Sequence, residues 1–222
     1  MLTIPAPTLL GLAERPGEAG GWGALDPALA RQLAAAAARD PRSTWCLTVT
    51  DEHGHAIGHG CAKAIRAKRR PGRPAARDGP WFTLTPAAGP GPGGGYGTWQ
   101  LRIAGRDYAV TIHPIPVTSC DHRYETAAYR PGRLLRHLVE VRDGQCTQPT
   151  CARAARGCDF EHAVPHHQGG RTCACNGGCR CRRDHRTKQS PGWNVEQLPG
   201  AHHRWTTPSG RQYTKGPREY PI

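Results

Sequence analysis

The chain has 222 residues, among them 28 Gly, 21 Pro and 10 Cys, a length that allows one or two small domains. No stretch approaches the roughly 18 consecutive apolar residues of a membrane-spanning helix, and the first 13 residues lack the basic start of a secretory signal. We therefore expect a cytoplasmic protein whose reduced cysteines bind metal, and we exclude a membrane-spanning chain.

Positive charge is concentrated in the C-terminal part of the chain. The formal net charge of the whole sequence is +13. Residues 130–222 hold 16 Lys and Arg against 7 Asp and Glu, a net charge of +9. An excess of this size on one part of a chain indicates a surface that meets a polyanion.

The N-terminal 60 residues predict one helix and one hairpin. Asp26 followed by Pro27 is typical of a helix start, because Asp accepts hydrogen bonds from free N–H groups and Pro fits the first helical turn. The helix is expected over residues 28–39. Residues 45–50 and 55–60 then alternate in a way that predicts two strands of a β-hairpin.

Residues 61–97 predict a basic linker. Six basic residues lie between Lys63 and Arg73, and 14 of residues 71–97 are Gly or Pro. Such a segment buries too little apolar surface to offset the entropy of ordering it. Residues 98–129 are expected to form a second β-hairpin and a connector.

The C-terminal region, residues 130–222, begins with a predicted helix. Apolar residues recur at helical spacing from Leu134 to Val141, and Asp143-Gly144 ends the pattern. After a cysteine-rich stretch, three short strands are expected over residues 193–198, 205–207 and 211–214.

Cysteine is gathered between these elements. Seven of the ten cysteines, at short spacings, are Cys146, Cys151, Cys158, Cys173, Cys175, Cys179 and Cys181. Two short-spaced ligand pairs about 30 residues apart are how a small domain with little core builds a tetrahedral zinc site. A disulfide-rich secreted protein is the alternative reading of the same residues.

A second group of residues points to hydrolysis. A hairpin carrying Glu161 and His162, followed by a basic helix over residues 182–188 with His185, would place one carboxylate and one imidazole on a shared divalent cation. His162 would remain free to deprotonate water, while the metal neutralises charge on a scissile phosphate. This is the chemistry of phosphodiester hydrolysis.

Four segments of this region resemble the HNH endonuclease module of an actinobacterial protein family, in which the module follows a helical domain of unknown function. The segments are residues 158–165 (CDFEHAVP), 169–176 (GGRTCACN), 181–188 (CRRDHRTK) and 191–193 (PGW). His162, Asn176 and His185 keep the order and approximate spacing of the three signature residues. Residues 10–60 are similar to the later part of the preceding domain, which implies a copy truncated at its N-terminus.

The resemblance implies a role for each matching residue. His162 becomes the general base, Asn176 orients the loop that carries it, and cleavage leaves a 5′-phosphate and a 3′-hydroxyl. Glu161 and His185 would hold a catalytic Mg²⁺ or Mn²⁺. A structural Zn²⁺ is implied at Cys146, Cys151 and Cys181, with the fourth ligand open between Asp184, Cys158 and Cys179. Backbone phosphates of double-stranded DNA are expected to meet Arg182, Arg183, Arg186 and Lys188.

We therefore expect an α+β protein with an N-terminal helix and β-hairpins, and a C-terminal zinc-stabilised ββα-metal domain with short C-terminal strands. The expected activity is metal-dependent hydrolysis of DNA, and the alternative is a non-catalytic zinc module that binds nucleic acid. Three features depart from the family: Glu161 stands where Asp is usual, Asp184 stands where His is usual, and Gly177 and Gly178 replace apolar residues. Inside a metal-binding helix each glycine would cost about 1 kcal/mol relative to alanine.

Overall fold

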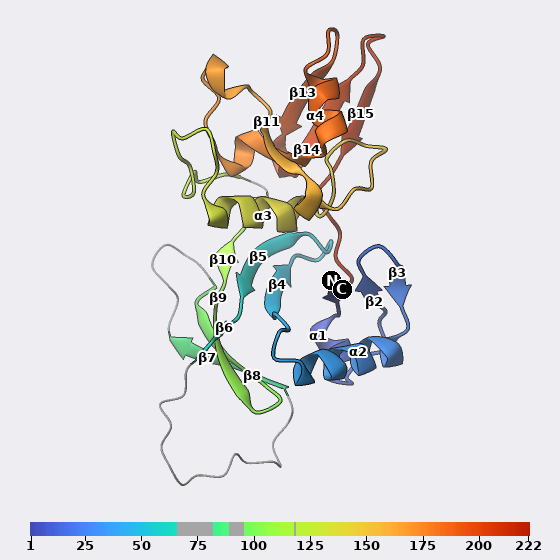
Figure 1. Cartoon of the computed structure of the whole chain (residues 1–222), viewed down its shortest axis with the longest axis vertical. Helices are drawn as coiled ribbons and strands as arrows, with labels where there is room; N and C mark the ends of the chain where they lie inside the picture. Colours follow the sequence, from blue (N-terminus) through green and yellow to red (C-terminus); the bar gives the residue numbers. More distant parts are fainter. Residues whose placement is uncertain (66–81, 89–95, 118) are drawn as a thin grey trace. The chain divides into compact units, whose positions relative to one another are not determined.

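The computed structural model describes residues 1–65, 82–88, 96–117 and 119–222, and within them it is a mixed α/β protein whose strands pair antiparallel (Figure 1). It divides into two compact units. The first comprises Met1–Glu52, Gly58–Pro114 and Tyr220–Ile222, and the second His53–Ile57 and Ile115–Glu219. No helix of the described residues is both long and apolar enough to span a membrane.

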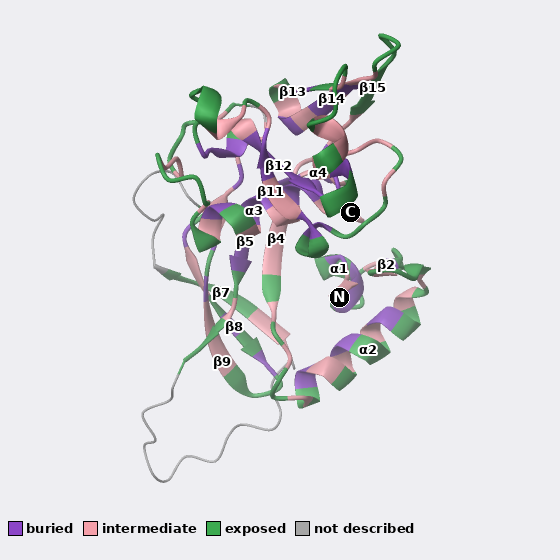
Figure 2. Cartoon of the chain, turned by 45° about the horizontal axis from the view of Figure 1, so that its top comes forward, coloured by how far each residue is buried: buried purple, intermediate pink, exposed green. Residues whose placement is uncertain are grey.

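The first unit begins with a small sheet and two helices. The sheet has the order β1 (Leu2–Thr3), β2 (Gly17–Ala19), β3 (Gly23–Leu25), and the helices are α1 (Ala6–Leu9) and α2 (Pro27–Arg39). Helix α2 starts as predicted, because the Asp26 carboxylate accepts hydrogen bonds from the backbone N–H groups of Ala28 at 2.9 Å and Leu29 at 3.1 Å. Its buried face carries Ala30, Ala34 and Ala38 (Figure 2).

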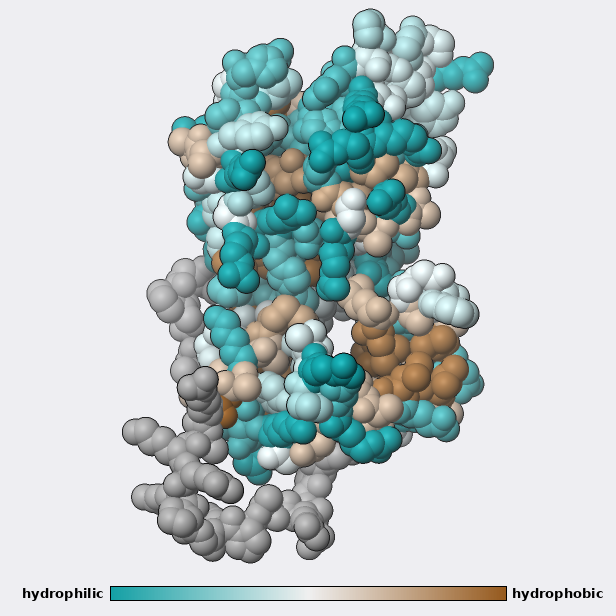
Figure 3. All heavy atoms as spheres, in the orientation of Figure 1, coloured by the Kyte–Doolittle hydropathy of each residue, from teal (hydrophilic) through white to brown (hydrophobic). Residues whose placement is uncertain are grey.

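Apolar side chains are exposed on these N-terminal elements. They include Leu10, Leu12, Trp22, Leu29 and Leu33. Figure 3 shows brown, hydrophobic atoms gathered over this part of the first unit. Trp22 is 89% exposed, so no contact within the described chain buries this large apolar side chain.

Two further sheets complete the first unit. One has the order β10 (His113–Pro114), β5 (Ala56–Cys61), β4 (Cys46–Thr50), and the other β6 (Lys63–Ala64), β9 (Arg106–Thr111), β8 (Thr98–Ile103), β7 (Phe82–Ala88). The pairs β4–β5 and β8–β9 confirm the two predicted hairpins. Leu101, Ile103 and Val110 are buried at the centre of this unit's core.

Strands β6 and β7 differ from the linker predicted over residues 61–97. In β7, Phe82 pairs with Ile103 and Leu84 with Leu101, an alternation that suits a sheet but is easily missed among the neighbouring Gly and Pro residues. The remainder of the predicted linker, residues 66–81 and 89–95, lies outside the described residues.

The second unit contains the cysteine-rich region. Its elements are α3 (Arg133–Asp143), η1 (Ala155–Gly157), β11 (Asp159–His162), η2 (His166–Gln168), η3 (Ala174–Asn176), β12 (Gly177–Arg180), α4 (Arg182–Lys188), β13 (Asn194–Leu198), η4 (Pro199–Ala201), β14 (His202–Thr206) and β15 (Gln212–Lys215). Strands β11 and β12 pair antiparallel, and β13, β14 and β15 form a three-stranded sheet. Helix α3 ends at Gly144, with φ 64°, as predicted.

A buried ion pair at the end of α3 holds β12 and the turn before it. Arg142 Nε lies 2.7 Å from the Asp143 carboxylate, and both side chains are 1% exposed. The same guanidinium donates hydrogen bonds to the carbonyls of Ala174 at 2.6 Å and Gly177 at 2.7 Å. Asp143 accepts another from the backbone N–H of Cys179 at 2.8 Å. Helix α3 therefore fixes the path of the chain into β12.

Sulfur replaces much of the hydrocarbon in the core of this unit. The buried cluster beside α3 consists of Leu135, Val139, Cys146, Ala155, Cys158, Ala174, Cys179 and Cys181. Four of these eight residues are cysteines, and the partly buried rings of Tyr124 and Phe160 pack against the cluster. Metal binding is the usual way for so small a core to gain stability.

Gly177 and Gly178 lie in strand β12 and not in a helix, so the expected helical penalty does not arise. A Cβ atom on Gly177 would stand 2.0 Å from Cζ of Phe160, and one on Gly178 2.5 Å from Cε1 of His203. Both positions therefore require glycine because neighbouring rings occupy the space of a side chain.

We expect Gly177→Ala to destabilise the protein by about 1–3 kcal/mol, because the added methyl group overlaps the ring of Phe160. Urea unfolding of the full chain measures the change. Gly157→Ala is the matched control, since its nearest atom would be Arg153 Nε at 3.5 Å and Gly157 is exposed. Equal stability of the two variants would contradict the assignment of Gly177 to a packed strand.

His203 on β14 is a buried imidazole that should make stability depend on pH. It is 1% exposed, and its ring nitrogens have no hydrogen-bond partner among the described residues. Burial, together with the positive charge of Arg180, lowers its pKa well below the ordinary value.

Below about pH 6.5 the unfolded chain binds a proton that buried His203 does not. The free energy of unfolding should therefore fall by about 1.4 kcal/mol from this residue alone between pH 7.5 and pH 5.5. We expect His203→Leu to show a correspondingly smaller fall in urea titrations at the two pH values. An identical fall in both proteins would show that His203 is not held neutral.

Candidate metal centres and pocket

Four ligand atoms of the second unit converge in what we call the first cluster. Its members are Cys146, Cys151, Cys181 and Asp184, whose donor atoms all lie within 4.8 Å of one another. Two of these residues come from the turn after α3, and two from the start of α4. The fold therefore unites ligands that are more than 30 residues apart in the sequence.

The distances within the first cluster suit zinc. A tetrahedral zinc ion sets sulfur, nitrogen and oxygen ligands about 3.5 to 3.8 Å apart. The Sγ atoms of Cys146 and Cys181 lie 3.3 Å and 3.1 Å from Oδ2 of Asp184. The sulfurs of Cys151 and Cys181 are 4.0 Å apart. These residues can hold a metal ion with only small adjustments.

Asp184 completes this group, whereas the other two candidates for the fourth position lie outside it. Cys158 and Cys179 are buried in the adjoining core. Burial opposes ionisation of Asp184, but hydrogen bonds from Arg183 and from the cluster's thiols outweigh it and lower the pKa of this carboxyl to about 2. Asp184 is therefore ionised at neutral pH, as a metal ligand must be.

A cavity of about 330 Å³ lies beside β11 and α4. Its lining includes Tyr129, Glu161, His162, His166, His185 and Lys188. The hairpin and the helix thus bring Glu161, His162 and His185, which are distant in the sequence, to one pocket.

Glu161 and His185 face each other across this pocket. Glu161 Oε2 lies 2.9 Å from Nε2 of His185, and His185 Nδ1 lies 3.2 Å from a carboxylate oxygen of Asp159. The other Glu161 oxygen lies 2.9 Å from the Lys188 ammonium, which also donates to the carbonyl of His162. Lys188 was expected on an exposed phosphate-binding face, but its side chain is only 9% exposed.

His162 is a buried neutral imidazole. Burial lowers its pKa, the neighbouring Lys188 ammonium and His166 ring lower it further, and Glu161 acts in the opposite direction. Its Nε2 lies 2.7 Å from Oγ1 of Thr172, whose own hydrogen is donated to the carbonyl of Ala128 at 2.6 Å. Thr172 must therefore accept the Nε2 hydrogen, which leaves Nδ1 of His162 unprotonated.

Asn176 ties together the loop that follows β11. Its Oδ1 accepts a hydrogen bond from the backbone N–H of Val164 at 2.7 Å. Its Nδ2 donates to the carbonyls of Val164 at 3.1 Å and Arg171 at 2.9 Å. Asn176 therefore closes the loop that begins directly after His162.

The arginines expected to meet phosphate lie on the exposed side of α4. Arg182 and Arg183 have side chains 70% exposed and are paired with Asp159 and Asp184, at 3.4 Å and 2.9 Å. Arg186 is also exposed. The pair between Arg182 and Asp159 is exposed and therefore weak, so this guanidinium can exchange its carboxylate for phosphate oxygens, whereas Arg183 is paired with the buried Asp184.

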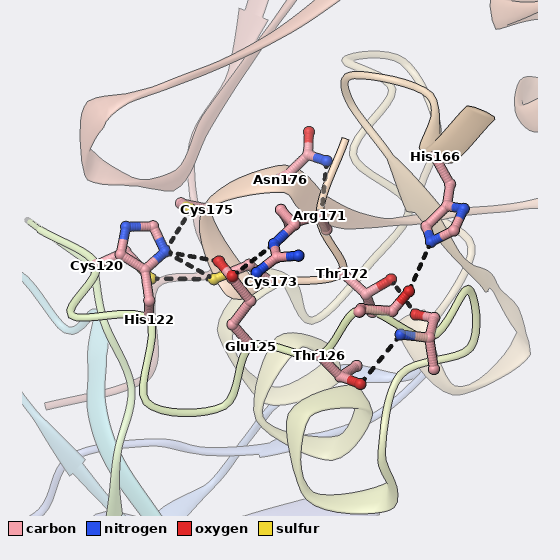
Figure 4. Close-up of polar contacts among 12 residues, drawn as sticks. Cys120, His122, Glu125, Thr126, His166, Arg171, Thr172, Cys173, Cys175 and Asn176 are labelled. Atoms are coloured by element: carbon pink, nitrogen blue, oxygen red, sulfur yellow. Dashed lines mark hydrogen bonds and ion pairs between the residues drawn. The ribbon is translucent and has the colours of Figure 1, made fainter. Parts of the chain in front are cut away.

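A second cluster was missed as a site in the sequence. Its members are Cys120, His122, Cys173 and Cys175, whose donor atoms also lie within 4.8 Å of one another (Figure 4). The spacings Cys120-x-His122 and Cys173-x-Cys175 were the available signal. Cys120 and His122 were not predicted as ligands, because they lie about 50 residues before Cys173 and Cys175 in the sequence.

Comparisons with known proteins give relatives that match over a limited part of the chain. The chain is 38% identical over 90 residues to "Uncharacterized protein Rv3776" of Mycobacterium tuberculosis strain H37Rv, a match that covers 40% of this chain and 17% of the relative. It is 34% identical over 119 residues to "Uncharacterized protein MT2160" of Mycobacterium tuberculosis strain CDC 1551, which covers 53% and 20%. The chain thus spans a fifth or less of the length of these curated relatives. No family model and no solved structure matches it.

Cys46 and Cys61 correct the expectation that the cysteines are reduced metal ligands. They form a disulfide between the neighbouring strands β4 and β5, with their Cα atoms 4.0 Å apart. The hairpin turn places the two residues side by side, and spacing in the sequence alone did not indicate this.

Three further residues surround His162 and were not predicted to do so. Tyr129 stacks on its ring with centroids 5.5 Å apart, and His166 meets it edge-on at 5.7 Å. Thr172 holds its Nε2. Nothing in the local sequence of Tyr129 or His166 indicates a contact with β11.

Proposed function

We propose that the C-terminal region is a ββα-metal nuclease of the HNH type that hydrolyses DNA phosphodiester bonds. The observation that carries the proposal is one pocket in which the Glu161–His185 pair lies beside a neutral His162. The order of β11, β12 and α4 supports it, because a hairpin followed by a helix is the arrangement that the sequence resemblance implies.

The residues present fit a divalent cation. Adjacent ligands of an octahedral ion with bonds of about 2.1 Å stand about 3 Å apart. Glu161 Oε2 and His185 Nε2 are 2.9 Å apart, so both can bind one Mg²⁺ or Mn²⁺. When bound, such an ion would neutralise charge on the scissile phosphate and on the leaving oxygen.

His162 supplies the base. Its Nε2–H donates a hydrogen bond to Thr172, so Nδ1 is the atom that takes a proton from water. Burial keeps the imidazole neutral at physiological pH, the form that can accept the proton. Asn176 holds the loop after His162 and thereby limits the movement of the base.

DNA would be held by the exposed face of α4 and the surrounding positive charge. Arg182, Arg183 and Arg186 present guanidinium groups that suit phosphate oxygens. Contacts of this kind position a backbone without reading bases, so we expect binding that weakens steeply with salt.

The test is nicking of supercoiled plasmid by zinc-loaded protein with Mg²⁺ or Mn²⁺. The expected products are nicked circles with 3′-hydroxyl ends. Zinc content is verified first, and EDTA added after that should prevent nicking. A protein that contains zinc and binds DNA but leaves plasmid intact would refute the nuclease proposal.

One observation favours the alternative of a non-catalytic zinc module that binds nucleic acid. The Lys188 ammonium lies 2.9 Å from Oε1 of Glu161 and already neutralises this carboxylate. A metal ion bound by Glu161 would therefore gain less electrostatic energy from it. If this pair persists, Mg²⁺ binds weakly. Isothermal titration with Mn²⁺ distinguishes the alternatives, because the nuclease proposal requires Lys188→Met to retain or strengthen Mn²⁺ binding at Glu161.

A further inference from the structure

We propose that the second cluster, formed by Cys120, His122, Cys173 and Cys175, binds a second structural Zn²⁺. Its ligands come from two segments of the second unit, one preceding α3 and one between β11 and β12. The donor set of three thiols and one imidazole is a common one for tetrahedral zinc. It shares no residue with the Glu161–His185 pair or with the first cluster.

The distances in the second cluster match a tetrahedral ion more closely than they match any bond between the groups. Cys120 Sγ and Cys173 Sγ are 3.5 Å apart, and His122 Nδ1 lies 3.4 Å and 3.8 Å from the sulfurs of Cys173 and Cys175. Sulfur and nitrogen ligands of one zinc ion stand about 3.5 to 3.8 Å apart. A disulfide would need about 2.05 Å between sulfurs.

The backbone at His122 supports a specific role for its ring. His122 has φ 57°, a left-handed conformation that is uncommon for residues other than glycine. This conformation turns Nδ1 toward the sulfurs of the other segment (Figure 4). An unfavourable backbone state at an exposed residue is expected where a ligand stabilises it.

A carboxylate lies next to the cluster and must be accounted for. Glu125 Oε2 lies 3.1 Å from His122 Nδ1, and its Oε1 accepts a hydrogen bond from Arg171 at 2.8 Å. When zinc binds Nδ1 of His122, Glu125 loses its contact with this nitrogen but keeps its ion pair with Arg171. Arg171 also offsets the negative charge of a zinc ion bound by three thiolates.

The second zinc would fasten the strap formed by residues 120–129 to the loop that holds His162. Beyond the cluster, Thr126 and Thr172 exchange backbone hydrogen bonds at 3.0 Å and 3.3 Å. Thr172 holds Nε2 of His162, and Tyr129 of the strap stacks on the same ring. This part of the inference, that the zinc positions the candidate base, rests on the proposed nuclease function.

The first experiment counts metal and does not depend on nuclease activity. The full chain, loaded with Zn²⁺ while the Cys46–Cys61 disulfide is intact, should contain about two zinc ions per chain by elemental analysis. Cys175→Ser and His122→Ala, both changes at exposed residues, should each contain about one. Cys158→Ala, which removes a thiol outside both clusters, should keep two.

Cobalt identifies the ligands of the ion that is lost. Co²⁺-loaded parent protein should show thiolate-to-metal charge transfer and tetrahedral d–d bands from two sites, and Cys175→Ser should lose about half of this absorbance. One zinc per chain in the parent, with no change in Cys175→Ser and His122→Ala, would overturn the proposal. A Cys120–Cys173 disulfide found by mass spectrometry in the metal-loaded protein would also overturn it.

The positioning role has its own readout. If plasmid is nicked by the parent, Cys175→Ser with the first cluster still loaded should nick at least tenfold more slowly and exchange amide hydrogens faster over residues 120–129 and 171–176. If the parent binds two zinc ions but does not nick, the nuclease proposal fails while the second zinc site stands. Unchanged nicking and exchange would refute the positioning role.

Discussion

Replacing His162 with alanine should reduce Mg²⁺-dependent nicking of plasmid by about 10²- to 10⁴-fold, the usual contribution of a general base. The reason is that Nδ1 of His162 is unprotonated in a pocket that Glu161 and His185 also line, and no other imidazole described in this pocket has its tautomer fixed by a hydroxyl as Thr172 fixes this one. Zinc content should not change, because His162 lies outside both clusters.

The control for this experiment is His137→Ala. His137 lies on α3 and is not in the pocket lining. The His137→Ala protein should therefore nick plasmid at the parent rate. Single-turnover rates with excess protein keep product release out of the comparison. Equal rates for the parent and His162→Ala, with zinc and DNA binding intact, would exclude His162 as the base.

The pH dependence of the parent gives an independent check on the base. His162 acts only when neutral, and burial lowers its pKa below the ordinary value of 6.5. The nicking rate should therefore stay level as pH falls from 8 to about 6.5 and decline only below that range. A rate that already falls above pH 7 would indicate a different titrating group.

Replacing Cys181 with alanine should abolish zinc binding at the first cluster and unfold most of the second unit. Cys181 is 4% exposed and stands at the junction of β12 and α4, where its sulfur approaches both Cys151 and Asp184. Structural zinc contributes about 10–16 kcal/mol to the folding of small zinc domains. This amount is comparable to the whole stability of a typical domain, about 5–15 kcal/mol.

Circular dichroism melts and zinc analysis measure this effect. Cys158→Ala is the matched control, since it removes another buried core thiol, outside the cluster, and should keep its zinc and a cooperative melt. Asp184→Ala should bind zinc more weakly than the control. If Cys158→Ala loses zinc and Asp184→Ala does not, the fourth ligand is assigned wrongly.

The sequence predicts those elements of the fold whose ends carry their own signals. Asp26 and Pro27 mark the start of α2, Gly144 marks the end of α3, and α4 has the predicted bounds Arg182–Lys188. The sequence left the secondary structure of Gly177 and Gly178 open, because a glycine that faces a ring across a strand and a glycine in a helix look alike in sequence. Only the positions of Phe160 and His203 distinguish the two.

The candidate site was predictable only in part for a similar reason. The order and spacing of Glu161, His162 and His185 predicted that these residues meet, and one pocket brings them together. Tyr129 and His122 belong to a strap that reaches the site through long-range contacts, and no local pattern reports such contacts. Cys46 and Cys61 show the same limit, since their pairing depends on the register of a hairpin.

Both clusters draw ligands from one short segment, residues 173–184, which contains little hydrocarbon. With two zinc sites, mass action sets the stability of the second unit: each tenfold fall in free zinc removes about 1.4 kcal/mol per site while the sites remain saturated. The first unit has a hydrocarbon core around Leu101 and Val110, and neither of the two clusters lies in it. Zinc scarcity would therefore lower the stability of the second unit and leave this hydrocarbon core unaffected.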